Sequence, residues 1–494
     1  MTIFIGPASY AQERIFLDEQ VRFSSKIAVY NELSVLRVVE GTISIDRFER
    51  AVGLVLAKHK IFRTSLVFNH ERSSLTQSII EQHSTFALVI EQTFRNDQEL
   101  QEIIYQRTTD ANLFDLATGR VFHCEILRQQ KSLYDPRFIT ESDVLLFVFH
   151  HAITDRMCNE IFHNDLCLAY NNDNIIATNE ETLQYVDYAV HERSLDMNLS
   201  KGFWRTHMQG YNLQCSLPLP VDRHCSINDR RTGFASSAEM YFNDSLTRAF
   251  TTYASLHQVT LFQLGLATFY AFLYKLSHGY SDLCVTCIDA NRFRSEFQDI
   301  MGIFLTILPY RVELNGQCSF DEFLKHVRET CLSILEHSHY PLQHILADCQ
   351  RSQADLSLLQ VAFDFITMSS STNPHLSLGD TTLKMFSSDP FYICAKYDFM
   401  LIFYYNSTSN DDQLFCRFVC SRDLFDDTTV AKIARRFQHF LEQIFSSDPA
   451  VNNTIDLHLT PMTQFNIILP EEIKAVQNVR CCRQSNIVNQ GRSN

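Results

Sequence analysis

Apolar residues follow two alternating spacings along the first third of the chain. Residues 46–60 place Phe48 and Val52 on one helical face, and Asp46 and Glu49 stand at the spacing of a capping box. Other runs are apolar at nearly every position, or at every second one, which indicates strands. These runs are residues 31–41, 119–127 and 143–151. The alternation of helix and strand signals predicts a layered α/β lobe.

The second half repeats this alternation after a polar stretch. Residues 259–276 are apolar almost all round, which predicts a buried helix, whereas residues 320–337 and 428–445 have one apolar face. Further strands are predicted at residues 282–290, 358–365 and 397–405. We therefore expect two α/β lobes of similar size, and we divide the chain into four segments. These are an N-terminal lobe at 1–175, a linker at 176–182, a C-terminal lobe at 183–447 and a partly disordered tail at 448–494.

The composition argues against several classes of function. Hydrophobic residues make up 45% of the 494 positions, which is enough for two packed cores. The net charge of −15 disfavours a nucleic-acid partner, because a phosphate-binding surface needs a basic field. No apolar run approaches the roughly 20 residues that cross a bilayer, and the N-terminus lacks the features of a signal peptide. We expect a cytoplasmic protein that contacts neither nucleic acid nor membrane.

Metal and redox chemistry have little support in the sequence. One Cys-x-x-Cys pair, Cys284 and Cys287, falls in a predicted strand, where residues three apart face opposite sides. This pair suits neither a zinc site nor a redox couple, and no second such pair exists. The sequence contains no Walker phosphate loop, no glycine-rich dinucleotide fingerprint and no His-Glu-x-x-His helix. We expect no metal and no bound cofactor.

The stretch Phe147–Met157, FVFHHAITDRM, carries the main candidate chemistry. His150 and His151 end an apolar strand, and Asp155 stands where a helix to about Tyr170 would begin. Strand ends in α/β layers are common ligand sites. Successive strand residues point to opposite faces, so one histidine can enter a crevice while the other packs inward. On these grounds a catalytic histidine and a structural histidine pair are both open.

The spacing His-x-x-x-Asp carries little weight alone, because it occurs three times. The other instances begin at His278, in a predicted helix end, and at His344, on a predicted short helix. Both have ordinary structural interpretations, as a helix-end residue and as part of an amphipathic face. Only the instance at His151 combines the spacing with a buried strand end.

Several segments in order resemble one family, the condensation domain of nonribosomal peptide synthetases, in the chloramphenicol-acetyltransferase-like superfamily. HHAITDR resembles its HHxxxDG motif, and ASYAQERIFLDEQ resembles its S-x-A-Q-x-R-L opening. LAKHKIFRTSL, DANRFRSEFQDIMGIFLTILPYRVEL and HSHYPLQHIL are similar to three later conserved segments. The resemblance runs from about residue 8 to residue 447.

The resemblance implies a fold and a reaction. The fold would be a V-shaped pseudo-dimer of two acyltransferase-like lobes with a tunnel between them. His151 would accept or position the proton of an amine that attacks a thioester, as a neutral imidazole can. His150 would be its packing neighbour, and Asp155 would form a structural pair with Arg292. Substrates would arrive on the 4′-phosphopantetheine arms of peptidyl or acyl carrier proteins acting in trans, with adenylation-domain proteins as further partners.

One residue departs from the family pattern. Arg156 stands where the motif has glycine, and its side chain could pair with Asp155, in competition with Arg292, or enter the tunnel. The leading interpretation is an amide- or ester-forming condensation enzyme. A carrier-docking or recruitment domain that has lost catalysis, favoured by Arg156, and an acyltransferase that uses acyl-CoA are the alternatives. An epimerase would need a second base, which the sequence does not reveal.

Overall fold

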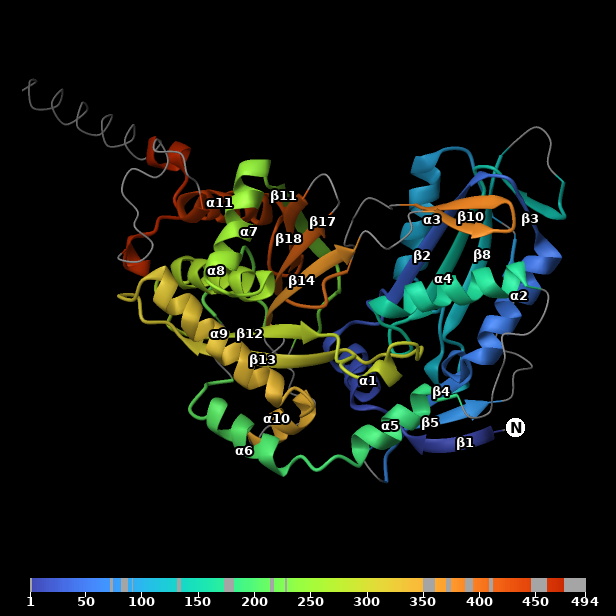
Figure 1. The fold of residues 1–494 in the computed structure, drawn as a ribbon, viewed down its shortest axis with the longest axis horizontal. Coiled ribbons are helices and arrows are strands. Elements are labelled where there is room, and N and C mark those ends of the chain that lie inside the picture. Colours follow the sequence, from blue (N-terminus) through green and yellow to red (C-terminus); the bar gives the residue numbers. More distant parts are fainter. Residues whose placement is uncertain are drawn as a thin grey trace, which may run out of the picture.

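The computed structural model describes two α/β halves that form an open V (Figure 1). The residues it describes are 2–71, 74–80, 88–90, 92–130, 135–172, 182–213, 217–226, 229–349, 360–369, 375–386, 394–407, 412–445 and 460–474. The expected linker falls almost wholly outside them, as does the expected tail apart from residues 460–474. Each half contains a large sheet with helices packed against it.

The first half is built on a mixed sheet with the strand order β15-β16-β2-β10-β8-β6. Strand β10 lies at its centre, antiparallel to both β2 and β8, and all seven of its residues are buried. The strands of the first half, including those of a small sheet β1-β5-β4 and of the pair β3-β9, are β1 (Thr2–Pro7), β2 (Asn31–Glu40), β3 (Thr42–Ser44), β4 (Thr64–Asn69), β5 (Ser74–Ile80), β6 (Leu88–Val89), β7 (Thr93–Phe94), β8 (Phe122–Gln129), β9 (Phe138–Thr140) and β10 (Val144–His150). Its helices are α1 (Tyr10–Arg22), α2 (Ile45–Lys58), α3 (Asp97–Thr109), α4 (Arg156–Asn171) and the 3-10 turns Lys60–Arg63 and Leu116–Thr118.

The second half contains a six-stranded sheet with the order β11-β18-β17-β14-β12-β13. Helix α8 is buried along most of its length beneath this sheet, as its apolar sequence predicts. The strands are β11 (Ala235–Tyr241), β12 (Asp282–Asp289), β13 (Thr306–Glu313), β14 (Val361–Ser369), β17 (Phe399–Ser407) and β18 (Asp412–Ser421). The helices are α5 (Tyr185–Arg193), α6 (Asn198–His207), α7 (Asp244–Leu256), α8 (Leu261–Leu276), α9 (Phe320–Glu336), α10 (Leu342–Asp348), α11 (Asp427–Phe445) and the 3-10 turns Ser295–Phe297 and Met462–Gln464.

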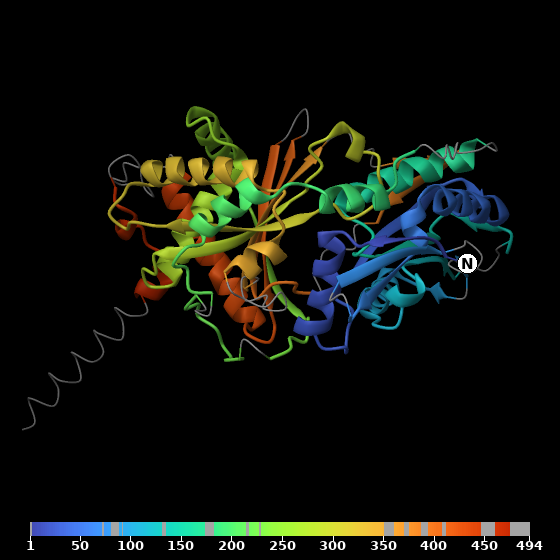
Figure 2. The same cartoon turned by 90° about the horizontal axis from the view of Figure 1, so that it is seen from below.

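Segments from the second half of the sequence cross into the first half. Strands β15 (His375–Leu378) and β16 (Thr381–Met385) form a hairpin, and β16 extends the first sheet by pairing with β2. Tyr185 and residues 300–304 belong to the first hydrophobic core rather than the second. Helix α1 lies between the two halves in both ribbon views (Figures 1 and 2). The halves are therefore joined by shared packing as well as by the chain.

One local expectation differs from the structure. Helix α2 begins at Ile45 after Ser44, and Ser44 makes no side-chain cap, so the predicted capping box at Asp46 and Glu49 is wrong. Residues 460–474, within the expected tail, contribute Met462 and Phe465 to the second core. Helix starts depend on which residue leaves the helical backbone first, and spacing alone does not determine it.

Among the described residues, one bent pair of helices has the length and composition of a membrane span. Within the described segments no single helix is long and apolar enough to cross a bilayer. Helices α7 and α8 meet the length and composition criteria only when taken together, and they are bent by 108° relative to one another.

Candidate active site at the HHAITD turn

The strand–turn–helix unit around His151 forms because the chain leaves a fully paired central strand and starts a capped helix. Strand β10 ends at His150, where the backbone N–H of His151 donates to Tyr30 O at 2.8 Å. Asp155 is the N-cap of α4, and its Oδ1 accepts the backbone N–H of Cys158 at 3.3 Å. A carboxylate at this position satisfies a free helix N–H and opposes the helix dipole. The expected helix start at Asp155 is confirmed.

The ring of His151 is held in one orientation by a backbone carbonyl. Its Nδ1 lies 2.7 Å from Thr154 O, and since a carbonyl can only accept, Nδ1 carries the proton. The lone pair of the neutral ring is therefore on Nε2. Nε2 lies 3.8 Å from Oε1 of Glu32, beyond hydrogen-bond distance, and 13% of the side chain remains exposed. His151 thus presents an available proton-accepting nitrogen.

Burial and a nearby cation keep this ring neutral. Burial, together with the nearby ammonium of Lys396, lowers the pKa of His151 to about 4, although Glu32 opposes the change. Lys396 Nζ lies 2.5 Å from Glu32 Oε1 and 5.4 Å from the centre of the Tyr30 ring. Lys396, with the contribution of His151, lowers the pKa of Glu32 to about 2 despite burial. At neutral pH His151 is uncharged and faces a carboxylate–ammonium pair.

His150 points to a different part of the molecule. Its Nδ1 accepts the backbone N–H of Ala152 at 3.1 Å, and its Nε2 lies 3.3 Å from Oε2 of Glu19. The ring meets Phe114 edge-on and lines an open depression of the first half. Successive residues at the strand end face opposite ways, as the strand geometry predicts.

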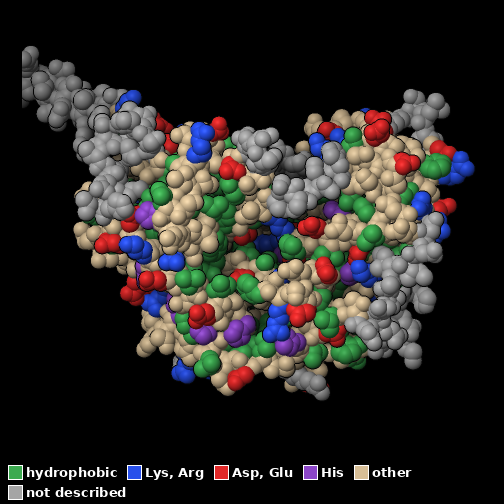
Figure 3. Space-filling view, in the orientation of Figure 1, with side chains coloured by type: hydrophobic (Ala, Val, Ile, Leu, Met, Phe, Trp, Pro, Cys, Tyr) green, Lys and Arg blue, Asp and Glu red, His purple; other side chains and the backbone are tan. Residues whose placement is uncertain are grey.

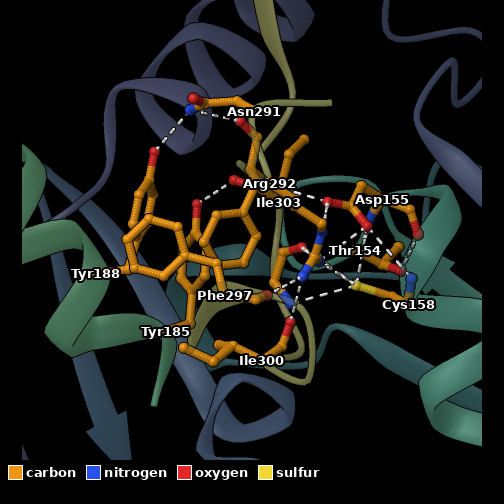
Figure 4. Close-up of polar contacts among 12 residues, drawn as sticks. Thr154, Asp155, Cys158, Tyr185, Tyr188, Asn291, Arg292, Phe297, Ile300 and Ile303 are labelled. Atoms are coloured by element: carbon orange, nitrogen blue, oxygen red, sulfur yellow. Dashed lines mark hydrogen bonds and ion pairs between the residues drawn. The ribbon is translucent and has the colours of Figure 1, made fainter. Parts of the chain in front are cut away.

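Asp155 and Arg292 join the two halves beside this turn (Figure 4). The guanidinium donates from Nε and Nη2 to the two carboxylate oxygens at 3.1 and 3.0 Å, and both side chains are about 95% buried. Arg292 also donates to Ile300 O and Gly302 O, and it lies 4.1 Å from the centre of the Phe304 ring. The structure therefore brings Asp155 and Arg292 together as a buried ion pair with full hydrogen bonding.

Arg156 does not disturb the ion pair between Asp155 and Arg292. Its side chain is exposed at the start of α4. Its charge acts on Asp364 of β14, in the other half, where burial raises the carboxyl pKa to about 6 and Arg156 opposes the rise. Of the two outcomes expected for Arg156, competition with Arg292 for Asp155 is not observed, and the side chain instead faces the opposite half.

A cavity of about 300 Å³ lies between the halves. The space-filling view shows that the molecular surface is hollowed between the halves (Figure 3). It is lined by residues of α1, of the end of α5, of the segment 291–307 and of residues 338–343. His151 is not one of its lining residues. Arg14 connects the two regions, because it lines the cavity and its charge contributes to lowering the pKa of His151.

Sequence reasoning missed the charged neighbours of His151. Glu32 lies on β2, and Lys396 lies two residues after Cys394, whose backbone bridges to Phe234. Neither Glu32 nor Lys396 belongs to a recognisable sequence motif. Their approach to His151 depends on packing between segments that lie far apart in the sequence, so no local signal could have identified them. Among the described residues no group of three or more His, Cys, Asp or Glu side chains is placed to hold a metal ion.

Comparisons with known proteins give the fold and the family. The family described as condensation domain matches residues 5–461. One of the linear gramicidin synthase proteins of Brevibacillus parabrevis is 24% identical over 89% of this chain, and surfactin synthase subunit 2 of Bacillus subtilis is 24% identical over 91%. The chain spans only 8% and 12% of the length of these two relatives.

Solved structures agree in fold at lower identity. The X-domain in its complex with OxyB from teicoplanin biosynthesis superposes with a TM-score of 0.77 at 20% identity, covering 94% of this chain and 96% of that one. The starter condensation domain of rhizomide synthetase, in complex with C8-CoA, superposes with a TM-score of 0.68 at 17% identity, covering 94% and 97%. The chain belongs to the condensation-domain family, and its two α/β halves are the two chloramphenicol-acetyltransferase-like lobes of that fold.

Proposed function

We propose that the chain is a condensation-domain acyltransferase that joins two carrier-tethered thioesters through an amide or ester bond, with His151 as the proton-handling residue. The observation that carries the proposal is the fixed tautomer of His151. Thr154 O holds the proton on Nδ1 and so leaves the lone pair on Nε2, which lies 3.8 Å from Glu32 Oε1; the side chain as a whole is 13% exposed. A histidine with a purely structural role would be expected to use both ring nitrogens in hydrogen bonds.

The chemistry follows from this geometry. The amine nitrogen bonds to the thioester carbonyl carbon, the carbon–sulfur bond breaks, and the proton lost by nitrogen ends on the departing thiolate. With a pKa of about 4, His151 is too weak a base to deprotonate an ordinary ammonium ion efficiently. The nitrogen becomes far more acidic once it has attacked the carbonyl. We therefore assign the transfer through Nε2 to the tetrahedral intermediate, after attack by the neutral amine.

The proposed partners are peptidyl or acyl carrier proteins that present the substrates on 4′-phosphopantetheine in the cytoplasm, with adenylation-domain proteins loading them. Holding both tethered reactants in one place supplies much of the rate gain. Asp155 and Arg292 support the turn that carries His151 and take no part in proton transfer. His150 takes no part in the proposed reaction, and its ring packs against Phe114.

A second function has a specific observation in its favour. Arg156 places a charge between the halves where the family motif has glycine, and the X-domain that shares this fold was solved in complex with OxyB. The second candidate is therefore a recruitment domain that binds carrier or modifying proteins without catalysis. Arg156→Gly separates the two, because removal of an obstructing side chain would raise a low rate, whereas a recruitment domain would stay inactive.

The test is amide formation in vitro. The chain is incubated with an acyl donor and an aminoacyl acceptor on separate carrier proteins, and the product is identified by mass spectrometry. Product that is lost in His151→Ala and retained in His344→Ala supports the proposal, since His344 lies on α10 with its ring against Tyr10. Carrier binding without product in both the natural chain and Arg156→Gly supports recruitment. Turnover with a free acyl-CoA and no donor carrier assigns the donor to the acyl-CoA class.

A further inference from the structure

The cavity between the halves contains a carboxyl group that the proposed chemistry does not use. Glu192 stands in the last turn of α5 and lines the cavity, yet only 7% of the residue is exposed. Its Oε1 accepts the backbone N–H of Tyr10 at 3.0 Å. Its Oε2 is buried and receives no hydrogen bond from a described residue. Burying a carboxylate oxygen without a hydrogen-bond donor costs free energy. A ligand that donates to Oε2 would remove this cost.

The surroundings of Glu192 only partly compensate its charge. Burial raises its pKa to about 7, although the N–H of Tyr10, Arg193 and the Tyr188 hydroxyl favour the charged form; Glu13 opposes them. The Tyr188 hydroxyl accepts a hydrogen bond from Asn291 Nδ2 at 3.1 Å, so its own O–H can still approach Glu192. A carboxylate oxygen has two lone pairs, so Oε2 retains room for a further donor.

The cations near the cavity are already engaged elsewhere. Arg193 pairs with Glu13 at 2.7 Å and lies 3.8 Å from the centre of the Tyr10 ring. Arg14 donates to Leu305 O at 3.1 Å. Arg294 lies over Phe297 rather than beside the carboxyl group. Of the remaining titratable lining groups, His191 and His339 flank the cavity and Asp196 stands at its exposed side. Among the described residues, none of these lining cations therefore supplies the donor that Glu192 Oε2 lacks.

We infer that the cavity between the halves is a binding site for a positively charged amine, with Glu192 Oε2 as the group that accepts its hydrogen bond. A primary ammonium supplies the N–H donor that Oε2 lacks and the positive charge that a buried carboxylate needs. A volume of about 300 Å³ accommodates an amino-acid-sized side chain. Where the proposed function holds, one of the two joined substrates carries a basic side chain; binding of the amine itself does not depend on that function.

Cadaverine (1,5-diaminopentane) is a suitable probe, and 1,5-pentanediol is its uncharged counterpart. Isothermal titration calorimetry of the whole chain should show binding of cadaverine and none of the diol. Glu192→Gln keeps the shape and removes the charge, and it should weaken cadaverine about ten- to hundred-fold. Asp196→Asn is the matched control, because Asp196 lines the same cavity and is exposed, and it should leave affinity within about two-fold.

A proton-linkage measurement needs no variant. Because Glu192 is half protonated near pH 7 and a bound cation favours its carboxylate, cadaverine should displace up to about half a proton at that pH. Repeating the titration in buffers of different ionisation enthalpy measures this release. Equal binding by Glu192→Gln, equal binding of the diol, or no binding of cadaverine would overturn the inference. If the chain binds cadaverine through Glu192 but forms no amide, the proposed function is wrong and the inferred binding site stands.

Discussion

Replacing Arg292 with alanine should destabilise the protein strongly, because it leaves the carboxylate of Asp155 buried without its partner. The two side chains are 5% and 6% exposed, and two hydrogen bonds of 3.0 and 3.1 Å join them. Removal of one member of such a pair typically costs about 3–5 kcal/mol. The backbone carbonyls of Ile300 and Gly302 lose donors as well. We expect a loss of at least about 3 kcal/mol.

The reciprocal change separates charge from helix capping. Asp155→Asn keeps an acceptor for the N–H of Cys158, since asparagine caps helices as well as aspartate does. Its cost therefore measures the unpaired charge of Arg292. The double variant Asp155→Asn with Arg292→Ala should be less destabilised than the sum of the single changes, with a coupling of about 1–3 kcal/mol.

Urea unfolding measures these free energies by linear extrapolation. Trp204, the single tryptophan, is fully buried in the second core and reports on that half, while circular dichroism reports on the whole chain. Following both signals reveals whether the halves unfold together. The control is Arg422→Ala, which breaks an exposed pair with Asp427 and should cost under about 1 kcal/mol. If Arg292→Ala costs no more than this control, the pair does not support the interface and the reasoning is wrong.

The remaining predictions concern the imidazole and the packing beside it. Lys396→Met removes a cation that disfavours protonation, so the pKa of His151 should rise from about 4 toward its ordinary 6.5; nuclear magnetic resonance titration of the ring measures it, and an unchanged or lower value contradicts the electrostatic account. On acidification, the His151 ring of this variant would then become protonated at a higher pH than in the natural chain. Gly302→Ala would place Cβ 1.9 Å from Tyr185 Cδ2 and should cost at least about 1–3 kcal/mol in urea unfolding. Gly53→Ala, in open space on α2, should be neutral or stabilising, and equal losses in the two variants would argue against the clash.

Local patterns were sufficient for most elements of the fold. The apolar run before His150 predicted the central strand β10, and the almost wholly apolar residues 259–276 predicted the buried helix α8. An element that is buried on several faces is apolar at nearly every position, so both elements can be recognised from their residue types alone. The α/β class and the two lobes follow from the repeated alternation of such signals together with the family resemblance, and the comparisons confirm them.

The crossing segments could not be predicted in this way. Strand β16 carries the same signal whichever sheet it joins, and its pairing with β2 depends on the path of the intervening chain. The pairing of Asp155 with Arg292 came from the family motif and is present, whereas the Glu32–Lys396 pair beside His151 had no motif to indicate it. Glu192 likewise gave no signal, because its role rests on a buried oxygen that only the packed structure reveals.

The central claim is that the free Nε2 of His151 handles the proton during bond formation. The most direct measurement is the single-turnover rate of amide formation between loaded carriers for the natural chain, His151→Ala and His344→Ala. The account predicts product with the natural chain, a loss of about 10²-fold or more in His151→Ala, and little change in His344→Ala. A natural rate that His151→Ala retains would contradict it.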